Sequence, residues 1–392
     1  MLKRQLFTDL LKYLSVFPVV GLIGPRYAGK TVLVKNALKW FSKQSVYLNM
    51  EFGPDHTRLS NADVYFESFS DHCIVVDEIQ NRSELIKEVR KSVDAHDTDG
   101  MFLIASSVIS DKLRKHSQLL SGRIGYLTLY PLDRLEVLDK SDVDTHWLRG
   151  GFPDSFLASS DNESFVYRDN LIQTLCERDL QQLGLRADPL SLRTFLRMIA
   201  TNQGQVWNAS IYARSMGLSS PTVKKYLENL EKVFLVSLLK PFMPDSKKRL
   251  VKAPKVYLAD SGLLHSLMEI ESINELKNHI LIGSSWEGYV VAQIQSILSR
   301  RVQIFHYSTH QGAQIDLLIA KSMKPLISIE IQTNNNPILS KGFKIAIKDV
   351  NTEMNFIVTP GSANYRLSHN IEVIDLDTLL LKLKEMFITA KG

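Results

Sequence analysis

A short run of residues near the N-terminus has the types and spacing that phosphate binding requires. The stretch GPRYAGKT fits the pattern G-x-x-x-x-G-K-[ST] and lies between a predicted strand, Val19 to Ile23, and a predicted helix, Val32 to Phe41. Glycine lets backbone N–H groups approach the phosphates, and the helix N-terminus adds a favourable partial charge. We therefore predict that a nucleotide is bound by Gly24, Pro25, Arg26, Tyr27, Ala28, Gly29, Lys30 and Thr31. Lys30 would reach the β- and γ-phosphates, and the Thr31 hydroxyl would bind Mg²⁺.

A second element, HCIVVDEIQ, is an apolar run that ends in Asp77 and Glu78. A continuous apolar run is typical of a parallel strand buried on both faces, and open α/β sheets bind ligands at the carboxyl ends of such strands. We expect Asp77 to help hold the Mg²⁺ and Glu78 to activate the attacking water. Capping of a helix is the alternative interpretation of these two acids.

The next apolar strand, MFLIASSV, ends in two serines that could act at the same site. Ser106 or Ser107 could contact the γ-phosphate or orient water. Arg123 in LLSGRIGY, or Arg114, is a candidate arginine finger for a neighbouring subunit. A surface arginine with no such role is the alternative.

Three carboxylates in the last third form a second candidate site. Asp316 in AQIDLLIA and Glu330 in LISIEIQ lie on two predicted strands joined around Lys321 to Pro325, and Glu287 lies near the start of a predicted helix. Such oxygen ligands bind Mg²⁺, which lowers the pKa of a bound water and neutralises a phosphodiester. Gln332 shares a strand face with Glu330 and offers hydrogen bonds without charge. Because a buried aspartate needs a partner, we expect a metal or a lysine beside Asp316.

The middle of the chain predicts a DNA-binding module. One helix ends at Met216 before Gly217, and Ser220 is predicted to cap a second helix that has Pro221 at its first position, which is typical of a helix-turn-helix. Two strands and a basic connection follow, so the module is interpreted as a winged helix. We predict salt-dependent DNA binding of low sequence specificity through Lys224, Lys225, Lys247, Lys248 and Arg249. Protein docking, or packing within the chain, is the alternative role of this module.

Composition limits the class of protein. The 392 residues suggest two or three domains, and 47 Lys+Arg against 42 Asp+Glu leave a net charge of +5, too small to indicate nucleic acid by itself. The two cysteines, Cys73 and Cys176, predict core packing and a reducing compartment without disulfides. The N-terminus is interpreted as an amphipathic helix, and no apolar run reaches about 20 residues. We therefore expect a cytoplasmic protein without a membrane partner.

Several of these motifs resemble one known family. GPRYAGKT, VVDEIQ, IASS, SGR and LYPL look like the predicted bacterial and archaeal AAA-class (AAA+ superfamily) ATPases that pair an ATPase domain with a C-terminal nuclease-like domain. The resemblance implies ATP and Mg²⁺ as cofactors, Glu78 as catalytic base and a possible homo-oligomer formed through the nucleotide site. The order of Glu287, Asp316, Glu330 and Gln332 resembles the PD-(D/E)XK nuclease superfamily, which has a lysine where this chain has Gln332.

Together these observations predict an α/β chain with four parts. We expect a parallel-sheet AAA+ P-loop domain over 1–140, a helical lid or connector over 141–195, a winged helix-turn-helix over 196–260 and an α/β restriction-endonuclease-like domain over 261–392. The predicted function is ATP hydrolysis with DNA binding, nucleotide state controlling the domain arrangement. A Mg²⁺-dependent, ATP-dependent DNA nuclease is one alternative, and a nucleotide-gated protein-interaction switch that does not bind DNA is another.

Overall fold

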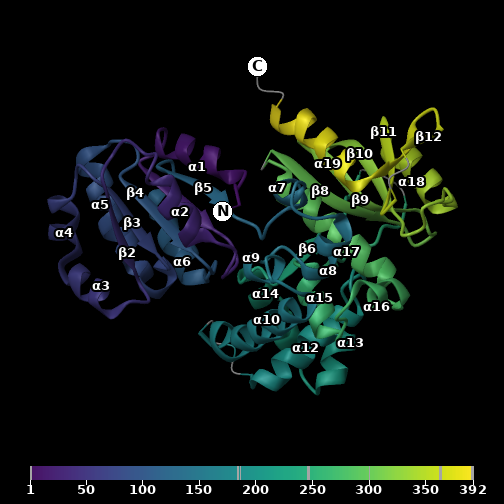
Figure 1. Cartoon of the computed structure of the whole chain (residues 1–392), viewed down its shortest axis with the longest axis horizontal. Helices are drawn as coiled ribbons and strands as arrows, with labels where there is room; N and C mark the ends of the chain where they lie inside the picture. Colours follow the sequence, from purple (N-terminus) through teal and green to yellow (C-terminus); the bar gives the residue numbers. More distant parts are fainter. Residues whose placement is uncertain are drawn as a thin grey trace. The chain divides into compact units, whose positions relative to one another are not determined.

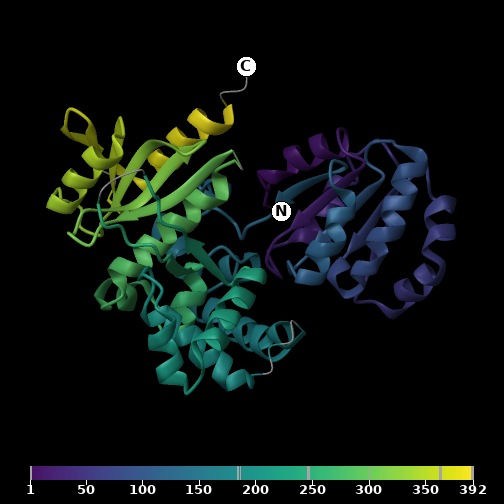
Figure 2. The ribbon, with the colours of Figure 1, turned by 180° about the vertical axis from the view of Figure 1, so that it is seen from behind.

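The computed structural model describes residues 2–182, 185, 187–244, 248–299, 301–361 and 364–389. The chain divides into an N-terminal unit, residues 1–132 with 232–234, and a C-terminal unit, residues 133–231 with 235–392. In Figures 1 and 2 the purple and most of the blue ribbon belong to the N-terminal unit, and nearly all of the teal to yellow ribbon belongs to the C-terminal unit. No described helix is both long enough and apolar enough to span a bilayer.

The N-terminal unit is built on a five-stranded sheet whose neighbouring strands are all parallel, in the order β2-β3-β4-β1-β5. The strands are β1 (Val19–Ile23), β2 (Ser45–Asn49), β3 (Cys73–Asp77), β4 (Phe102–Ser106) and β5 (Ile124–Thr128). Both β3 and β4 are buried along their whole length, as their continuous apolar runs predict. The predicted parallel-sheet α/β fold is therefore confirmed for this unit.

Helices cover both faces of this sheet (Figure 1). On one face, α1 (Leu6–Leu14) and α2 (Lys30–Ala37) pack their leucines against β1, β3 and β4. On the other face lie α4 (Ala62–Ser68), α5 (Ile86–His96) and α6 (Asp111–Ser117), and α3 (Gly53–Arg58) precedes α4. The α2 helix begins two residues earlier than predicted because Gly29, with a φ of 93°, ends the preceding loop directly before Lys30.

The helical part of the C-terminal unit comes before and after a two-stranded hairpin. Its helices are α7 (Arg134–Val137), α8 (Val143–Arg149), α9 (Pro153–Phe156), α10 (Asp161–Thr174), α11 (Leu180–Gln182), α12 (Pro189–Thr201), α13 (Ala209–Met216), α14 (Ser220–Lys232), α15 (Ser261–Leu267) and α16 (Ile273–Asn278). The hairpin consists of antiparallel β6 (Val236–Leu239) and β7 (Lys255–Leu258).

The predicted pair of helices around Gly217 is present. Gly217 ends α13 with a φ of 64°, and the buried positions of α14 are those that the helical spacing predicts: Val223, Tyr226, Leu227 and Leu230. The N-terminal cap of α14 lies one residue earlier than expected, because the Ser219 hydroxyl, and not that of Ser220, accepts from the Thr222 N–H at 3.3 Å.

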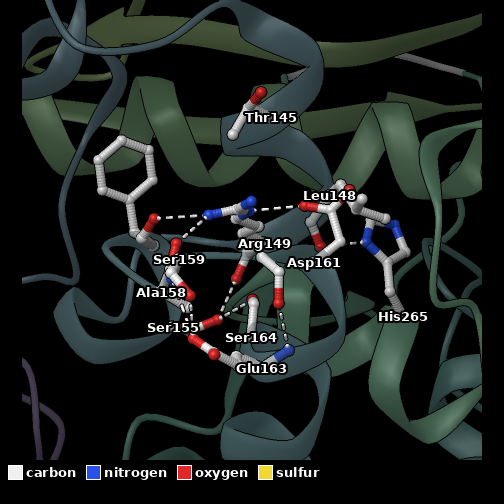
Figure 3. A network of polar contacts seen from close by, with 12 residues as sticks. Thr145, Leu148, Arg149, Ser155, Ala158, Ser159, Asp161, Glu163, Ser164 and His265 are labelled. Carbon is white, nitrogen blue, oxygen red and sulfur yellow. Dashed lines mark hydrogen bonds and ion pairs between the residues drawn. The ribbon is translucent and has the colours of Figure 1, made fainter.

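Arg149 at the end of α8 fixes the connection between α8, α9 and α10 (Figure 3). Its Nε donates to Asp161 Oδ1 at 2.7 Å, and Nη1 donates to Ala158 O at 2.6 Å. Next to it, His265 of α15 makes a hydrogen bond through Nδ1 to Leu148 O at 2.9 Å (Figure 3). These contacts join α8, α10 and α15 in one polar network.

His265 is buried and fully hydrogen-bonded in its neutral form. Because Leu148 O can only accept, Nδ1 carries the proton and Nε2 accepts from the Ser285 hydroxyl at 2.7 Å. The same Ser285 oxygen accepts from Trp147 Nε1 at 2.9 Å. Burial lowers the pKa of His265 to about 3.

A six-stranded sheet with the order β12-β13-β11-β10-β9-β8 forms the rest of the C-terminal unit (Figure 1). Its strands are β8 (Val302–Ser308), β9 (Gln314–Lys321), β10 (Lys324–Ile331), β11 (Met354–Thr359), β12 (Tyr365–Ser368) and β13 (Ile371–Asp375). The first three are antiparallel, whereas β10, β11 and β13 are parallel. Helices α17 (Ile282–Ile297) and α19 (Leu376–Lys384) share one apolar core with the sheet, and α18 (Lys341–Val350) shares another.

Candidate functional site

The phosphate-binding motif forms a tight loop at the carboxyl end of β1. Gly24 leaves the strand with a φ of 157°, and a Cβ at this position would lie 2.1 Å from Leu129 O. Tyr27 and Gly29 also have positive φ values, 64° and 93°. A glycine is therefore required at Gly24, and the loop ends where the first turn of α2 presents its free N–H groups.

The Lys30 side chain is held inside this loop. It is only 4% exposed, and its ammonium donates to Gly24 O at 3.0 Å and Pro25 O at 2.9 Å. Arg4 supports the same loop from the segment before α1 by donating to Ala28 O at 2.7 Å and to Tyr130 O at 2.6 Å. Two cationic side chains thus hold carbonyl oxygens of the loop.

Asp77 accepts hydrogen bonds from two hydroxyl groups that belong to different elements. Thr31 Oγ1 and the Tyr47 hydroxyl donate to Asp77 Oδ2 at 2.7 and 2.5 Å, and the Glu78 N–H donates to Oδ1 at 3.0 Å. Burial and the Asp77 carboxylate raise the pKa of Tyr47, so that its phenol stays a donor. A buried carboxylate beside a threonine hydroxyl is an oxygen donor set that fits Mg²⁺.

Glu78 is held in an unusual backbone conformation beside the same loop. Its φ of 54° is rare for a residue with a side chain. Ser107 Oγ donates to Glu78 Oε1 at 2.7 Å, and Gln80 Nε2 donates to Oε2. Ser106 Oγ donates to Gln80 Oε1 at 2.7 Å. Because β4 lies between β1 and β3, the two predicted serines sit between the loop and the two acids.

Two arginines of the predicted site, Arg26 and Arg123, form ion pairs within the chain, whereas Arg114 is exposed on α6. Arg26 forms an ion pair with Glu51. Arg123 forms ion pairs with Asp94 at 2.9 Å and Asp97 at 3.5 Å, and its carbonyl accepts from the N–H of Val19, at the start of β1. Arg123 therefore lies near the amino end of β1, whereas the loop follows the carboxyl end of the same strand. Its predicted role toward a neighbouring subunit remains a prediction.

Sequence reasoning missed Tyr47, Gln80 and Arg4. The signal for Gln80 was present, since it lies two residues after Glu78 in the stretch DEIQ. Tyr47 and Arg4 come from other elements, and no local pattern connects them with the loop. Only the packing of β2 beside β3 brings the Tyr47 hydroxyl to Asp77.

The second predicted site contains a lysine that the sequence pattern did not connect with it. Lys255 of β7 reaches Glu287 Oε1 at 2.7 Å and Asp316 Oδ1 at 3.4 Å. The Tyr257 hydroxyl also donates to Glu287 Oε1, at 2.6 Å. The expectation that a metal or a lysine accompanies Asp316 is met by Lys255.

No three Asp, Glu, His or Cys side chains converge as the ligands of a metal in the described part of the chain. The predicted metal role of Glu287, Asp316 and Glu330 stays a prediction, and the Lys255 ammonium lies between the first two acids. Glu330 is 7% exposed and its Oε2 lacks a hydrogen-bond partner among the described residues. Gln332 Nε2 donates to Ile338 O at 2.9 Å.

Burial and charge act in opposite directions on this cluster. Burial raises the pKa of Glu287, and the nearby Asp316 carboxylate raises it further against the effect of Lys255. Burial lowers the pKa of Lys255, but Glu287 and Asp316 together outweigh it, so that the pKa is raised. Burial also raises the pKa of Glu330. The ammonium therefore stays charged at neutral pH.

The predicted DNA-contacting residues differ in their surroundings. Lys224 and Lys225 are exposed on α14, and Arg249 is exposed in the connection between β6 and β7. Lys248 forms an ion pair with Asp349 at 2.5 Å. Lys247 lies outside the described residues. Packing within the chain, the alternative role of this basic segment, therefore applies to Lys248.

Protein-family models cover most of the chain in three blocks. Residues 16–138 match the model described as an AAA domain. Residues 140–274 and 282–379 match two domains of unknown function, DUF8612 and DUF4143. The AAA-domain match supports ATPase activity in general for the N-terminal unit.

Two mycobacterial relatives extend the likeness over nearly the whole chain. The uncharacterized proteins Rv2008c of Mycobacterium tuberculosis and Mb2031c of Mycobacterium bovis are each 33% identical over 96% of this chain and 84% of their own length. Among solved structures, the Walker-type ATPase of Pyrococcus abyssi aligns with a TM-score of 0.48 and 15% identity, over 68% of this chain and 96% of that one. The relatives and the AAA-domain match together place this chain in the family of the two mycobacterial proteins, with an AAA-type domain at its N-terminus.

Proposed function

We propose that this protein hydrolyses ATP in its N-terminal unit and binds DNA through its C-terminal unit. The observation that carries the first half is the 2.7 Å contact between Thr31 Oγ1 and Asp77 Oδ2, which joins the phosphate-binding loop to the acidic strand end. These are the two side chains that a nucleotide-bound Mg²⁺ needs, and Glu78 is adjacent in sequence to Asp77. Nucleotide state would then control the arrangement of the domains.

Each residue of the site has a defined task in this proposal. Lys30 exchanges its two carbonyl contacts for the β- and γ-phosphates. Thr31 and Asp77 would hold Mg²⁺, which would supply charge neutralisation on the phosphate oxygens. Glu78 accepts a proton from the attacking water, and Ser107 and Gln80 aim its carboxylate. Ser106 positions Gln80 from the neighbouring strand.

The direct test of the ATPase proposal is turnover by the purified full-length chain. We expect phosphate release that depends on Mg²⁺ and rises when duplex or single-stranded DNA is added. Turnover that DNA leaves unchanged, together with no DNA binding at low salt, would instead support the nucleotide-gated interaction switch. An absence of ATP hydrolysis with and without DNA contradicts the proposal itself.

The Tyr47 hydroxyl provides a test of the magnesium part of the site. Tyr47→Phe removes one of the two hydroxyl groups on Asp77 Oδ2 and leaves the ring in place. Groups that hydrogen-bond to a metal ligand typically change metal affinity by about 10- to 100-fold, so we expect the half-saturating Mg²⁺ concentration to rise about tenfold. The measurement is a Mg²⁺ titration of ATPase activity. Tyr65→Phe, on the far side of β2 in α4, is the control, and equal titrations for both variants would rule out this role of Tyr47.

We further propose that residues 196–260 act as a winged helix-turn-helix. Support comes from α13 and α14 around Gly217, followed by the β6–β7 hairpin. The exposed side chains of Lys224 and Lys225 on α14, with Arg249, suit phosphate contacts. With no arginine among the exposed residues of α14, sequence-tolerant binding is the expected form.

A double variant tests the DNA contact. Lys224→Ala with Lys225→Ala removes two phosphate contacts, so the slope of log K against log salt is expected to fall by about 1.8 for duplex DNA. Fluorescence anisotropy across a salt series measures this slope. The control is Lys341→Ala with Lys344→Ala on α18, which removes the same charge at two exposed positions. The DNA-contact assignment fails if this control lowers the slope as much as the Lys224→Ala, Lys225→Ala variant does.

The remaining domain boundaries are proposals of the same kind. We propose a lid or connector at 141–195 and a nuclease-like domain at 261–392, the latter supported by acids at Glu287, Asp316 and Glu330 around a mixed sheet. A homo-oligomer formed through the nucleotide site, with Arg123 contributed by the neighbouring copy, belongs to this proposal. Light scattering with and without nucleotide would test for assembly.

A further inference from the structure

Lys255 occupies the position between two carboxylates that a bridging cation would otherwise take. Its Nζ lies 2.7 Å from Glu287 Oε1 and 3.4 Å from Asp316 Oδ1. The side chains involved come from three separate elements: the β6–β7 hairpin, α17 and β9. With side-chain exposures of 15% for Lys255, 19% for Glu287 and 9% for Asp316, water screens these charges poorly.

Three carboxylate oxygens of this cluster are already used in hydrogen bonds. Glu287 Oε1 accepts from both Lys255 and Tyr257. Asp316 uses Oδ1 for Lys255 and Oδ2 for the Ile331 N–H at 3.0 Å. The Oε2 of Glu330 is the buried oxygen that lacks a hydrogen bond among the described residues. Mg²⁺ and Mn²⁺ sites use several oxygen ligands, whereas the Glu287 and Asp316 oxygens nearest the centre of this cluster already accept hydrogen bonds from Lys255.

A tethered ammonium also competes well with a free ion. Lys255 is part of strand β7, so its concentration at the site does not depend on the solution. A divalent ion could enter between Glu287 and Asp316 only if the ammonium left both carboxylates, and it would then lie beside a buried like charge. The donor set therefore does not fit the metal that the nuclease-like pattern implies.

We propose that Lys255 is the resident cation of this acidic cluster, that it keeps divalent ions from Glu287 and Asp316, and that the C-terminal unit consequently binds without metal-dependent cleavage. The Lys255 ammonium does not replace the lysine that is absent at position 332, because it neutralises the acids directly instead of standing beside an ion that they hold. The inference goes beyond the proposed ATPase function and holds whether or not the N-terminal unit hydrolyses ATP.

Mn²⁺ binding to the nucleotide-free full-length protein tests this inference. Paramagnetic resonance would count bound Mn²⁺ in the wild type, Lys255→Met, Asp316→Asn and the double variant of the last two. We expect no Asp316-dependent Mn²⁺ binding in the wild type up to about 1 mM, a range in which weak protein sites fill. Lys255→Met is expected to gain one Mn²⁺ site whose dissociation constant is at least about tenfold below that 1 mM limit. Adding Asp316→Asn to this variant is expected to remove the site. Subtracting the Asp316→Asn background excludes ions held at Asp77.

The controls separate loss of the fold from gain of a site. Lys252→Met removes an exposed lysine from the same connection and should bind Mn²⁺ like the wild type. If Lys255→Met does not fold by circular dichroism, Lys255→Met with Glu287→Gln removes both charges and leaves Asp316 and Glu330 open to Mn²⁺. Folded Lys255 variants that bind no more Mn²⁺ than the wild type would overturn the proposal.

A cleavage assay gives a second, independent readout. Supercoiled plasmid is incubated with wild-type protein and Mg²⁺ or Mn²⁺, with and without ATP, beside the Asp316→Asn variant. The expected result is an intact plasmid with both proteins. Nicking by the wild type that disappears in Asp316→Asn would show that the cluster holds a catalytic metal despite Lys255, and it would overturn the inference whatever the ATPase assay gives.

Discussion

Glu78→Gln is expected to lower ATP turnover by at least about a hundredfold while nucleotide affinity stays near that of the wild type, since general bases typically contribute 10²- to 10⁴-fold. Glutamine has the same length and shape as glutamate and tolerates the same backbone, here at a φ of 54°. Its amide oxygen can still accept from Ser107, but it cannot take the proton of the attacking water. The substitution thus removes basicity with little change in packing.

Two measurements resolve this expectation. Steady-state phosphate release gives the turnover number, and a fluorescent nucleotide gives the affinity. Lys30→Ala should lower both the turnover number and the nucleotide affinity, because the ammonium that reaches the β- and γ-phosphates is removed. The matched control is Glu84→Gln, which makes the same change at an exposed position of the following turn. A Glu78→Gln protein within about threefold of wild-type turnover would not be consistent with Glu78 as the base.

Mild acid is expected to destabilise the C-terminal unit through its buried histidine. His265 has a pKa near 3 in the folded chain, because burial opposes its charge, whereas an unfolded histidine titrates near 6.5. Between these two values the unfolded chain binds more protons, so stability is full above about pH 6.5 and falls as the pH drops toward 3. At about 1.4 kcal/mol per pH unit, the free energy of unfolding should decrease by about 2 kcal/mol at pH 5. His306, whose pKa burial lowers to about 4, acts in the same direction.

Tryptophan fluorescence during urea unfolding reports this unit, because the buried Trp147 and Trp286 both belong to it and lie 5.0 Å apart between ring centroids. His265→Asn keeps a donor toward Leu148 O and does not titrate. The free energy of unfolding of this variant should therefore decrease by about 2 kcal/mol less than that of the wild type between pH 7 and 5. His369→Asn removes an exposed histidine and serves as control. An unchanged pH profile in His265→Asn would mean that the acid sensitivity arises elsewhere.

The local architecture of the nucleotide site could be predicted because it depends on neighbours in sequence. Strand β1 has the expected bounds, and Gly24 and Gly29 adopt the backbone angles for which only glycine is favourable. The apolar run of β3 and the helical spacing of Val223, Tyr226, Leu227 and Leu230 report burial directly. In each case one chain segment contains all the information that decides its own conformation.

The sequence by itself therefore determined the loop, the acidic strand end and the order of elements along the chain. Tertiary structure decided which side chains meet: β4 between β1 and β3 puts Ser106 and Ser107 beside the acids, and β2 brings Tyr47 to Asp77. It also placed Lys255, far from Asp316 in sequence, where a metal had been expected. The physical reason is that strand order and helix packing are set by burial over the whole unit, which no local pattern of residue types encodes.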